Sequence, residues 1–322
     1  MRAFLLESFD GPDALRLTTT AEPSPGEDGV VVRVRAVGVN FPDLLTTRGK
    51  LADLPSLPTI PGREIAGVVE HAPRDSAWRP GDRVAAYIDH GGYAEAVEVP
   101  LDRVMALPAS ADFAAGAALV VNYQTAYFAL TTRGRLASGE TVLVLGAAGG
   151  IGTAAVQVAG ASGARVIAGV ANEEQAETAL SAGAGDAVVL ATGFAAKVRA
   201  LSGEGVDVVV DPLGGDVSLE ALRCLRPEGR HLVVGFVAGG VPALPANRLL
   251  MRNLEAIGVS WTGPMRAPGP GFADVGRILA EMYERNLLRP QIGARYALTD
   301  LPFALSQLEQ GAVHGKAIVE IG

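Results

Sequence analysis

A glycine-rich turn between two apolar segments is the feature that most constrains how this chain can fold. Residues 141–146 (TVLVLG) have the length and composition of a buried strand, and residues 151–163 have those of a helix. Glycines stand between and within them at 146, 149, 150 and 152. Glycine lets a backbone turn sharply and approach a pyrophosphate, which the N–H groups at the helix N-terminus then bind. We therefore expect a dinucleotide-binding turn, although position 147 is alanine; a glycine turn without a ligand is the alternative.

The chain after this turn alternates short apolar runs with helix-like segments. Strands that are apolar on both faces are typical of a parallel sheet covered by helices on both sides. The pattern therefore predicts a doubly wound α/β domain. Its strands are predicted over residues 141–146, 165–170, 186–190, 206–211, 229–235 and 254–259, with helices over 151–163 and 173–183.

The first 118 residues have a different texture. Short β-branched runs are separated by glycine and proline, which predicts an irregular, barrel-like β domain. Apolar residues at helical spacing predict one or two helices over residues 112–134 and further helices near the C-terminus. The remaining strands are predicted over 30–39, 64–70, 83–88, 93–100 and 316–321, and the C-terminal helices over 271–288 and 298–311.

Composition excludes several classes of protein. The chain has 322 residues and a net charge of −8, so no basic field favours nucleic acid. The uncharged stretch 141–164 is long enough to cross a membrane, but its glycine cluster favours a turn instead. A single cysteine, Cys224, excludes an intrachain disulfide and a zinc site built from several thiolates. We expect a soluble protein of the reducing cytoplasm without a membrane or nucleic-acid partner.

The end of the second predicted strand bears on the cofactor. An acidic residue there would bind the ribose 2′-hydroxyl of NAD, but the sequence reads Gly169-Val170-Ala171-Asn172. A neutral residue favours NADPH, because it does not repel a 2′-phosphate. Two glutamates rather than a basic residue follow Asn172, so NADH stays possible.

The whole chain resembles the medium-chain dehydrogenase/reductase superfamily, and most of all its zinc-independent quinone oxidoreductase (zeta-crystallin-like) branch. The resemblance implies a GroES-like β-rich catalytic domain over residues 1–118 and 266–322 and a Rossmann domain with a doubly wound parallel sheet over 119–265. The segments that carry it are GVNFPDLL (38–45), PGREIAG (61–67), RPGDRV (79–84), GGYAEAVEVP (91–100), VNYQTAYFAL (121–130), LGAAGGIG (145–152), DPLGG (211–215), VVGFVAGG (233–240) and HGKAIVEI (314–321).

The resemblance also predicts that no metal takes part. The zinc-dependent branch carries Cys and His ligands at two places where this chain has Asn40-Phe-Pro-Asp43 and Gly62-Arg63-Glu64. Without a Lewis acid, oxidation of an alcohol loses the group that stabilises its alkoxide. Reduction of an electron-poor acceptor, a quinone or an α,β-unsaturated carbonyl, stays feasible.

Specific site residues follow from the resemblance. The candidate catalytic residues are Asn40, as a hydrogen-bond donor to the acceptor oxygen, Asp43 and Tyr127. Each has a structural alternative: Asn40 holding a loop, Asp43 orienting backbone, and Tyr127 as a core aromatic. Gln175 and the leucines at 45 and 51 depart from the lysine and tyrosines that the family often has. The cofactor-binding residues implied are Asn40, Thr125, Gly149, Gly150, Ile151, Gly152, Asn172, Gln175, Gly235, Phe236, Val237 and Lys316.

Three functions remain open at this stage. The expected activity is NADPH-dependent hydride transfer to a quinone. The alternatives are reduction of an enone or enoyl thioester, and an NADPH-binding structural or regulatory role with little turnover. Trp261 and Met265 follow the last strand of the predicted parallel sheet, and by resemblance we expect a homodimer through that sheet edge.

Overall fold

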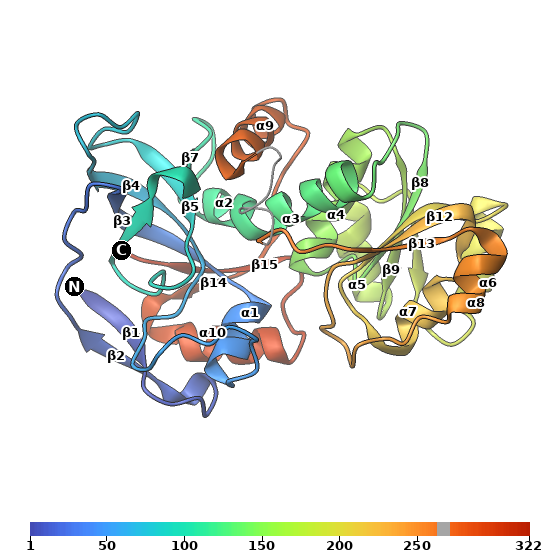
Figure 1. Ribbon diagram of the computed structural model, residues 1–322, viewed down its shortest axis with the longest axis horizontal. Coiled ribbons are helices and arrows are strands. Elements are labelled where there is room, and N and C mark those ends of the chain that lie inside the picture. The colour runs from blue at the N-terminus through green and yellow to red at the C-terminus, as the bar shows by residue number, and fades with distance from the viewer. Residues whose placement is uncertain (263–270) are drawn as a thin grey trace. The chain divides into compact units, whose positions relative to one another are not determined.

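The computed structural model describes residues 1–262 and 271–322 and divides them into two compact units (Figure 1). The described residues of the β-rich unit are 1–121, 271–285 and 292–322, and those of the parallel-sheet unit are 122–262 and 286–291. The first predicted boundary, 118/119, differs from this division by three residues. The second, 265/266, and Met265 lie outside the described residues.

The parallel-sheet unit contains a six-stranded parallel sheet of order β10-β9-β8-β11-β12-β13, so the predicted doubly wound sheet is confirmed. The order reverses direction between β8 and β11, which is where such folds bind ligands. Its strands are β8 (Thr141–Leu145), β9 (Arg165–Val170), β10 (Asp186–Val189), β11 (Val206–Asp211), β12 (Leu225–Val233) and β13 (Glu255–Gly258). Its helices are α4 (Gly150–Ala161), α5 (Glu173–Ser181), α6 (Phe194–Ser202), α7 (Gly215–Ala221) and α8 (Ala246–Arg252).

The core of this unit explains why these segments are strands. Consecutive residues of β8 and β11, such as 142–145 and 208–210, are inaccessible to solvent, because helices cover both faces of the sheet. β12 begins at Leu225, four residues before the prediction. Its partner strand β11 shifts register between Val206 and Val208, and the extra residues of β12 are accommodated there.

The β-rich unit contains a seven-stranded mixed sheet of order β14-β15-β3-β4-β5-β7, with β6 also paired to β3. The last strand pairs antiparallel with β3, with Ala317 opposite Val39, and returns the end of the chain to its N-terminal part. Its strands are β3 (Gly29–Val39), β4 (Glu64–His71), β5 (Arg83–Tyr87), β6 (Ala96–Pro100), β7 (Val104–Ala106), β14 (Ile292–Ala297) and β15 (Lys316–Glu320), and a separate hairpin pairs β1 (Arg2–Leu6) with β2 (Leu15–Thr19).

The alanine-rich segment is one continuous helical stretch, Phe113–Arg133. It comprises α2 (Phe113–Ala118), α3 (Gln124–Tyr127) and wider π-helical turns after each. The stretch is long and apolar enough to cross a membrane, but 78% of its most apolar window is buried inside the protein. It is therefore a core helix. The uncharged stretch 141–164 forms β8 and α4, as its glycines predicted.

Three further helices complete the β-rich unit: α1 (Phe41–Thr47), α9 (Phe272–Glu284) and α10 (Leu301–Glu309). The sequence patterns predicted α9 and α10, whose ends differ from the expected ones by up to four residues. They did not predict α1, which is only seven residues long and too short to show a helical period. Pro42 stands within its first turn, where the missing N–H of proline costs nothing because backbone N–H groups there have no partner within the helix.

Candidate functional site

The glycine turn after β8 has the backbone that the sequence predicts. Gly146 adopts a φ of +60°, a left-handed conformation that glycine takes without strain. The N–H of Gly149 closes the turn on the Gly146 carbonyl at 2.9 Å. A Cβ on Gly152 would overlap the Gly146 carbonyl and lie 2.7 Å from the Cα of Ala147. Gly152 is therefore required for the helix to start this close to the strand.

The N-terminus of α4 suits an anionic ligand. Gly149 is its N-cap, so no side chain accepts hydrogen bonds from the first-turn amides, and no acidic residue stands in that turn. Those amides, which include Gly150, Ile151 and Gly152, have no carbonyl one turn earlier to bind. With the positive end of the helix dipole, they fit a pyrophosphate without further side chains.

Two other loops lie at the same edge of the sheet, after β11 and β12. The Val237 N–H donates to the Pro212 carbonyl at 3.1 Å and the Ala238 N–H to the Leu213 carbonyl at 2.9 Å. A Cβ on Gly146 would lie 2.9 Å from the Leu213 side chain. The structure therefore joins the glycine turn, residues 211–215 and the predicted Gly235–Val237 segment into one surface. Phe236 and Val237 are 41% and 49% exposed on it.

A buried polar cluster holds the loop after β11. Asp211 Oδ1 accepts from the backbone N–H of Leu213 and Gly214 at 2.9 and 3.0 Å. Asp211 Oδ2 accepts from the Ser218 hydroxyl and lies 2.8 Å from His231 Nε2. Burial alone would raise the pKa of Asp211, but the hydrogen bonds and charge of His231, with Ser218 and Gly214, lower it. The cluster fixes the loop after β11, and the carbonyls of Pro212 and Leu213 in that loop in turn hold the Phe236 segment through the N–H groups of Val237 and Ala238. The DPLGG motif by itself did not reveal the partners of Asp211.

Asn172 and Gln175 lie at the carboxyl end of β9, the strand next to β8. Asn172 is the N-cap of α5, and its side-chain oxygen accepts from the Gln175 N–H at 2.9 Å. The Gln175 side-chain oxygen accepts from the Ala171 N–H at 3.0 Å. The capping role explains both residue types. Contact with a 2′-phosphate stays a prediction.

Thr125 and Tyr127 lie in α3, which packs against α4. Thr125 is buried and Tyr127 is half-buried. Both stand between two π-helical turns, a local irregularity that is frequent at functional sites. Their proposed contacts with cofactor and acceptor stay predictions.

The other predicted residues meet in the β-rich unit, around a carboxylate that sequence reasoning did not select. Glu64, the first residue of β4, is inaccessible to solvent. Its Oε1 accepts from Asn40 Nδ2 at 2.8 Å and pairs with the Lys316 ammonium. Its Oε2 accepts from the Val121 N–H at 2.7 Å. Lys316 also donates to Asn40 Oδ1 at 2.6 Å. We call Asn40, Glu64 and Lys316 the buried triad.

The triad accounts for both polar atoms of the Asn40 side chain. Nδ2 binds Glu64, with the Gly38 carbonyl 3.4 Å away, and Oδ1 binds Lys316. In this structure, therefore, the amide links a buried cation to a buried anion. Its predicted donation to an acceptor oxygen would use the hydrogen that now points to Gly38.

Asp43 orients backbone at the start of α1. Its Oδ2 accepts from the Asn40 N–H at 3.0 Å and from the Tyr93 hydroxyl at 2.9 Å. Its Oδ1 accepts no hydrogen bond within the described residues, and Arg63 Nε lies 3.8 Å from it. Burial raises the pKa of Asp43 to about 6, although Arg63 and Tyr93 act to lower it.

The raised pKa of Asp43 predicts a pH-dependent stability. Between about pH 4 and 6 the folded chain keeps a proton on Asp43 that the unfolded chain has lost, because the folded pKa exceeds the unfolded value of 3.8. The contribution of Asp43 to the free energy of unfolding should therefore fall by about 3 kcal/mol as pH rises through this window. Urea denaturation at pH 4 to 7 should show this fall as the difference between the native chain and Asp43→Asn. The exposed control Asp75→Asn should keep it; equal slopes in Asp43→Asn and the native chain would refute the assignment.

The surroundings of the buried triad also bear on whether this unit could bind a zinc ion. The described residues contain no group of three or more His, Cys, Asp or Glu side chains placed to hold a metal ion. At the two places where the zinc-dependent branch has its ligands, Asn40 and Glu64 already bind the Lys316 ammonium, and Arg63 faces Asp43. A divalent cation would meet two positive side chains and no thiolate or imidazole. These residues do not fit a zinc ion.

Comparison with known proteins gives a consistent result. The model described as alcohol dehydrogenase GroES-like domain matches residues 26–109, and the model described as zinc-binding dehydrogenase matches residues 150–272. Quinone oxidoreductase-like protein 2 of Bos taurus is 33% identical over 324 aligned residues, covering 99% of this chain and 92% of its own.

Solved structures agree over the full length. A probable oxidoreductase from Mycobacterium abscessus is 42% identical, with a TM-score of 0.90 and coverage of 100% of this chain and 99% of its own. The Escherichia coli quinone oxidoreductase complexed with NADPH is 26% identical, with a TM-score of 0.91 and full coverage of both chains.

Proposed function

Because the chain belongs to the medium-chain dehydrogenase/reductase superfamily, as an oxidoreductase of its quinone oxidoreductase-like group, we propose that it reduces a quinone with NADPH and without a metal. The observation that carries the proposal is the α4 N-terminus, which lacks a side-chain cap and follows a glycine turn at the point where the strand order reverses. A relative of the same fold is complexed with NADPH, which supports this cofactor.

The residues of the parallel-sheet unit would bind the two halves of the cofactor. The amides of Gly150 to Gly152 would hold the pyrophosphate while Gly149 closes the turn before them, and the exposed side chains of Phe236 and Val237 would offer an apolar surface to the nicotinamide. Asn172 and Gln175 would lie by the 2′-phosphate. When bound, the cofactor supplies a hydride; the chain supplies orientation and exclusion of water.

The acceptor gains negative charge on oxygen when the hydride arrives, so catalysis needs a donor or a cation near that oxygen. In the β-rich unit we propose Asn40 and Lys316 for this task, since Glu64 holds both in place. Asp43 acts by orienting the Asn40 backbone. Reduction to a hydroquinone also consumes one proton from water, with Tyr127 as the candidate that relays it.

An acceptor panel tests the reaction. NADPH absorbance should fall with quinones such as 1,4-benzoquinone and fall more slowly, or not at all, with enones and enoyl thioesters. Turnover with enones or enoyl thioesters alone would assign the chain to the alternative reductase. Tight NADPH binding without oxidation by any acceptor would favour the binding protein. Parallel fluorescence titrations with NADPH and NADH should favour NADPH; preference for NADH would show that Asn172 and Gln175 form no phosphate pocket.

We also propose a cytoplasmic homodimer. In the described part of the chain, β13 stands at the edge of the six-stranded sheet, and an edge strand can pair with its twin. Light scattering after size exclusion should give about 66 kDa, twice the 33.1 kDa of one chain. A mass of one chain at micromolar concentration would refute the dimer.

A further inference from the structure

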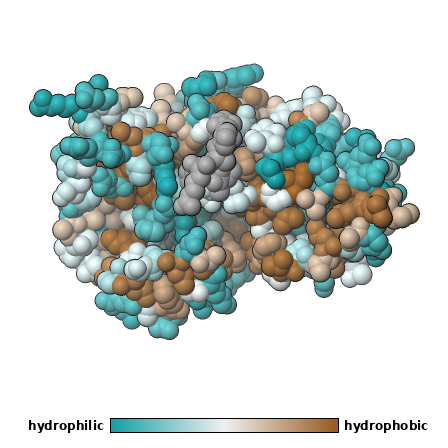
Figure 2. Space-filling model, in the orientation of Figure 1, coloured by the Kyte–Doolittle hydropathy of each residue, from teal (hydrophilic) through white to brown (hydrophobic). Residues whose placement is uncertain are grey.

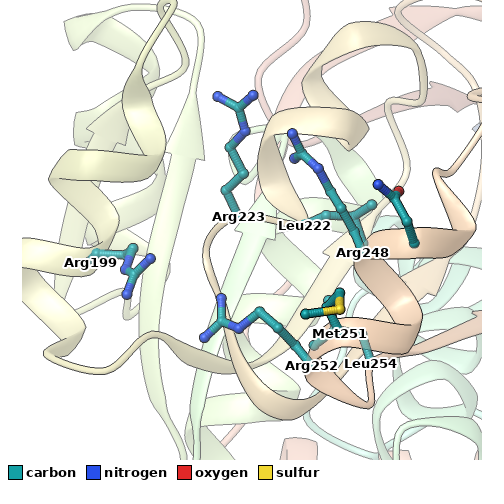
Figure 3. Close-up of a pocket in the computed structure, with 8 residues that line it drawn as sticks. Arg199, Leu222, Arg223, Arg248, Met251, Arg252 and Leu254 are labelled. Carbon is teal, nitrogen blue, oxygen red and sulfur yellow. The ribbon is translucent and has the colours of Figure 1, made fainter.

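A cavity lies in the parallel-sheet unit, away from the glycine turn. It has a volume of about 450 Å³ and is lined from α6, from the residues between α7 and β12, and from α8 with Leu254 (Figure 3). Arg223 follows α7 and Leu254 precedes β13 directly, so both lie at the amino edge of the sheet. The glycine turn follows the carboxyl end of β8. The cavity is therefore separate from the proposed dinucleotide site.

Four arginines line this cavity without a carboxylate partner. Arg199, Arg223, Arg248 and Arg252 form no ion pair within the described residues, whereas neighbouring Arg226 and Arg230 pair with Asp207 and Glu140. Figure 3 shows Arg223 and Arg248 extending in the same direction and Arg199 turned toward Arg252.

The helix dipoles explain the positions of only two of the four arginines. Arg199 and Arg252 stand near the C-terminal ends of α6 and α8, where a cation is favoured. Arg248 stands in the first turn of α8, where the dipole disfavours it, and within the described residues its side chain donates one hydrogen bond, to the Leu219 carbonyl at 3.4 Å. Glu220, the acid next to Ala221 at the end of α7, accepts from the Ala195 N–H at 3.2 Å. Four guanidinium groups that line one cavity and form no ion pair within the described residues, in a chain of net charge −8, point to an anionic ligand.

Apart from Asn247, the rest of the lining is apolar. Leu222 and Leu254 are buried at the cavity, and Met251 beside them is 78% exposed. Figure 2 shows an apolar patch on the parallel-sheet unit where Figure 1 places α8, and Leu250 and Met251 belong to that helix. Inorganic phosphate would leave this surface and most of the volume unfilled, since such a volume suits an organic ligand.

We propose that this cavity binds a small amphipathic anion, a phosphate or carboxylate on a short hydrocarbon chain. The arginines bind the head group, and Leu222, Met251 and Leu254 bind the chain. This site is independent of the proposed reductase activity, because none of its residues lies in the glycine turn or the buried triad.

Calorimetry with octyl phosphate, octanoate, octyl glucoside and inorganic phosphate tests the site below micelle-forming concentrations. Octyl phosphate and octanoate should bind. Inorganic phosphate and the uncharged octyl glucoside should bind at least about tenfold more weakly. The double variant Arg223→Glu, Arg248→Glu removes two charged contacts of about tenfold each. Its affinity for octyl phosphate should therefore fall by about a hundredfold. Met251→Ser should weaken octyl phosphate but not inorganic phosphate.

The control Arg74→Glu, Arg277→Glu makes the same charge change at exposed positions of the other unit and should keep octyl phosphate binding. NADPH titration checks that each variant is folded, and Arg223→Gln replaces the double variant if that one does not fold. Absent or undiminished octyl phosphate binding would overturn the proposal. Binding to phosphatidylglycerol vesicles but not to the free anions would also overturn it. The same holds if the native chain binds neither octyl phosphate nor octanoate and the double variant loses the dimer.

Discussion

Replacing Glu64 with alanine should lower the free energy of unfolding by about 3–5 kcal/mol, the cost of leaving a buried charge unpaired. Lys316 and Glu64 are 4% and 0% exposed at their side chains, so water cannot replace the lost carboxylate. The same change removes the acceptor for Asn40 Nδ2 and for the Val121 N–H. Chemical denaturation at pH 7 measures the loss.

A double-mutant cycle separates the ion pair from simple loss of packing. Glu64→Gln, Lys316→Met removes both charges and keeps similar volumes, so it should be more stable than either Glu64→Gln or Lys316→Met alone. Glu281→Gln at the exposed pair with Arg277 serves as the control and should have little effect. Additive single changes, or a native-like Glu64→Ala, would show that the triad does not depend on charge pairing.

Replacing Gly152 with alanine should weaken NADPH binding by at least about tenfold, the equivalent of one lost charge-assisted hydrogen bond. The added methyl group would meet the Gly146 carbonyl and lie 2.7 Å from the Cα of Ala147. These are backbone atoms, so the turn itself must open and the first-turn amides of α4 must shift. The strain should also lower the free energy of unfolding by about 1–3 kcal/mol.

Gly149→Ala is the matched control for this change. A Cβ at Gly149 has only the Gly146 carbonyl near it, at 3.4 Å, and its φ of −80° suits alanine. Its stability should therefore stay close to that of the native chain. Nicotinamide fluorescence and denaturation of the two variants give the comparison. Native NADPH affinity in a folded Gly152→Ala would mean that the pyrophosphate is not bound at this turn.

Local patterns predicted the parallel sheet because most of its strands contain consecutive apolar residues rather than an alternation of apolar and polar ones. The run 206–211 needed no partner to be recognised, and the structure places β11 on the same residues. The same reasoning failed for α1 and for β14, whose alternating burial follows from pairing with β15 rather than from a strong local pattern. Glu64 was missed because a single acid in a short strand resembles a solvent-facing residue.

The sequence by itself determined the glycine turn, since glycine adopts the positive φ at 146 without strain and no Cβ fits the close helix start at 152. It also determined the alternation of strands and helices around that turn, because both are properties of neighbouring residues. Only the tertiary structure decided that Asn40, Glu64 and Lys316 meet, since β3 pairs with both β4 and β15 and brings together ends that lie up to 276 residues apart. Burial then makes the three polar groups bind one another, because no water remains to satisfy them.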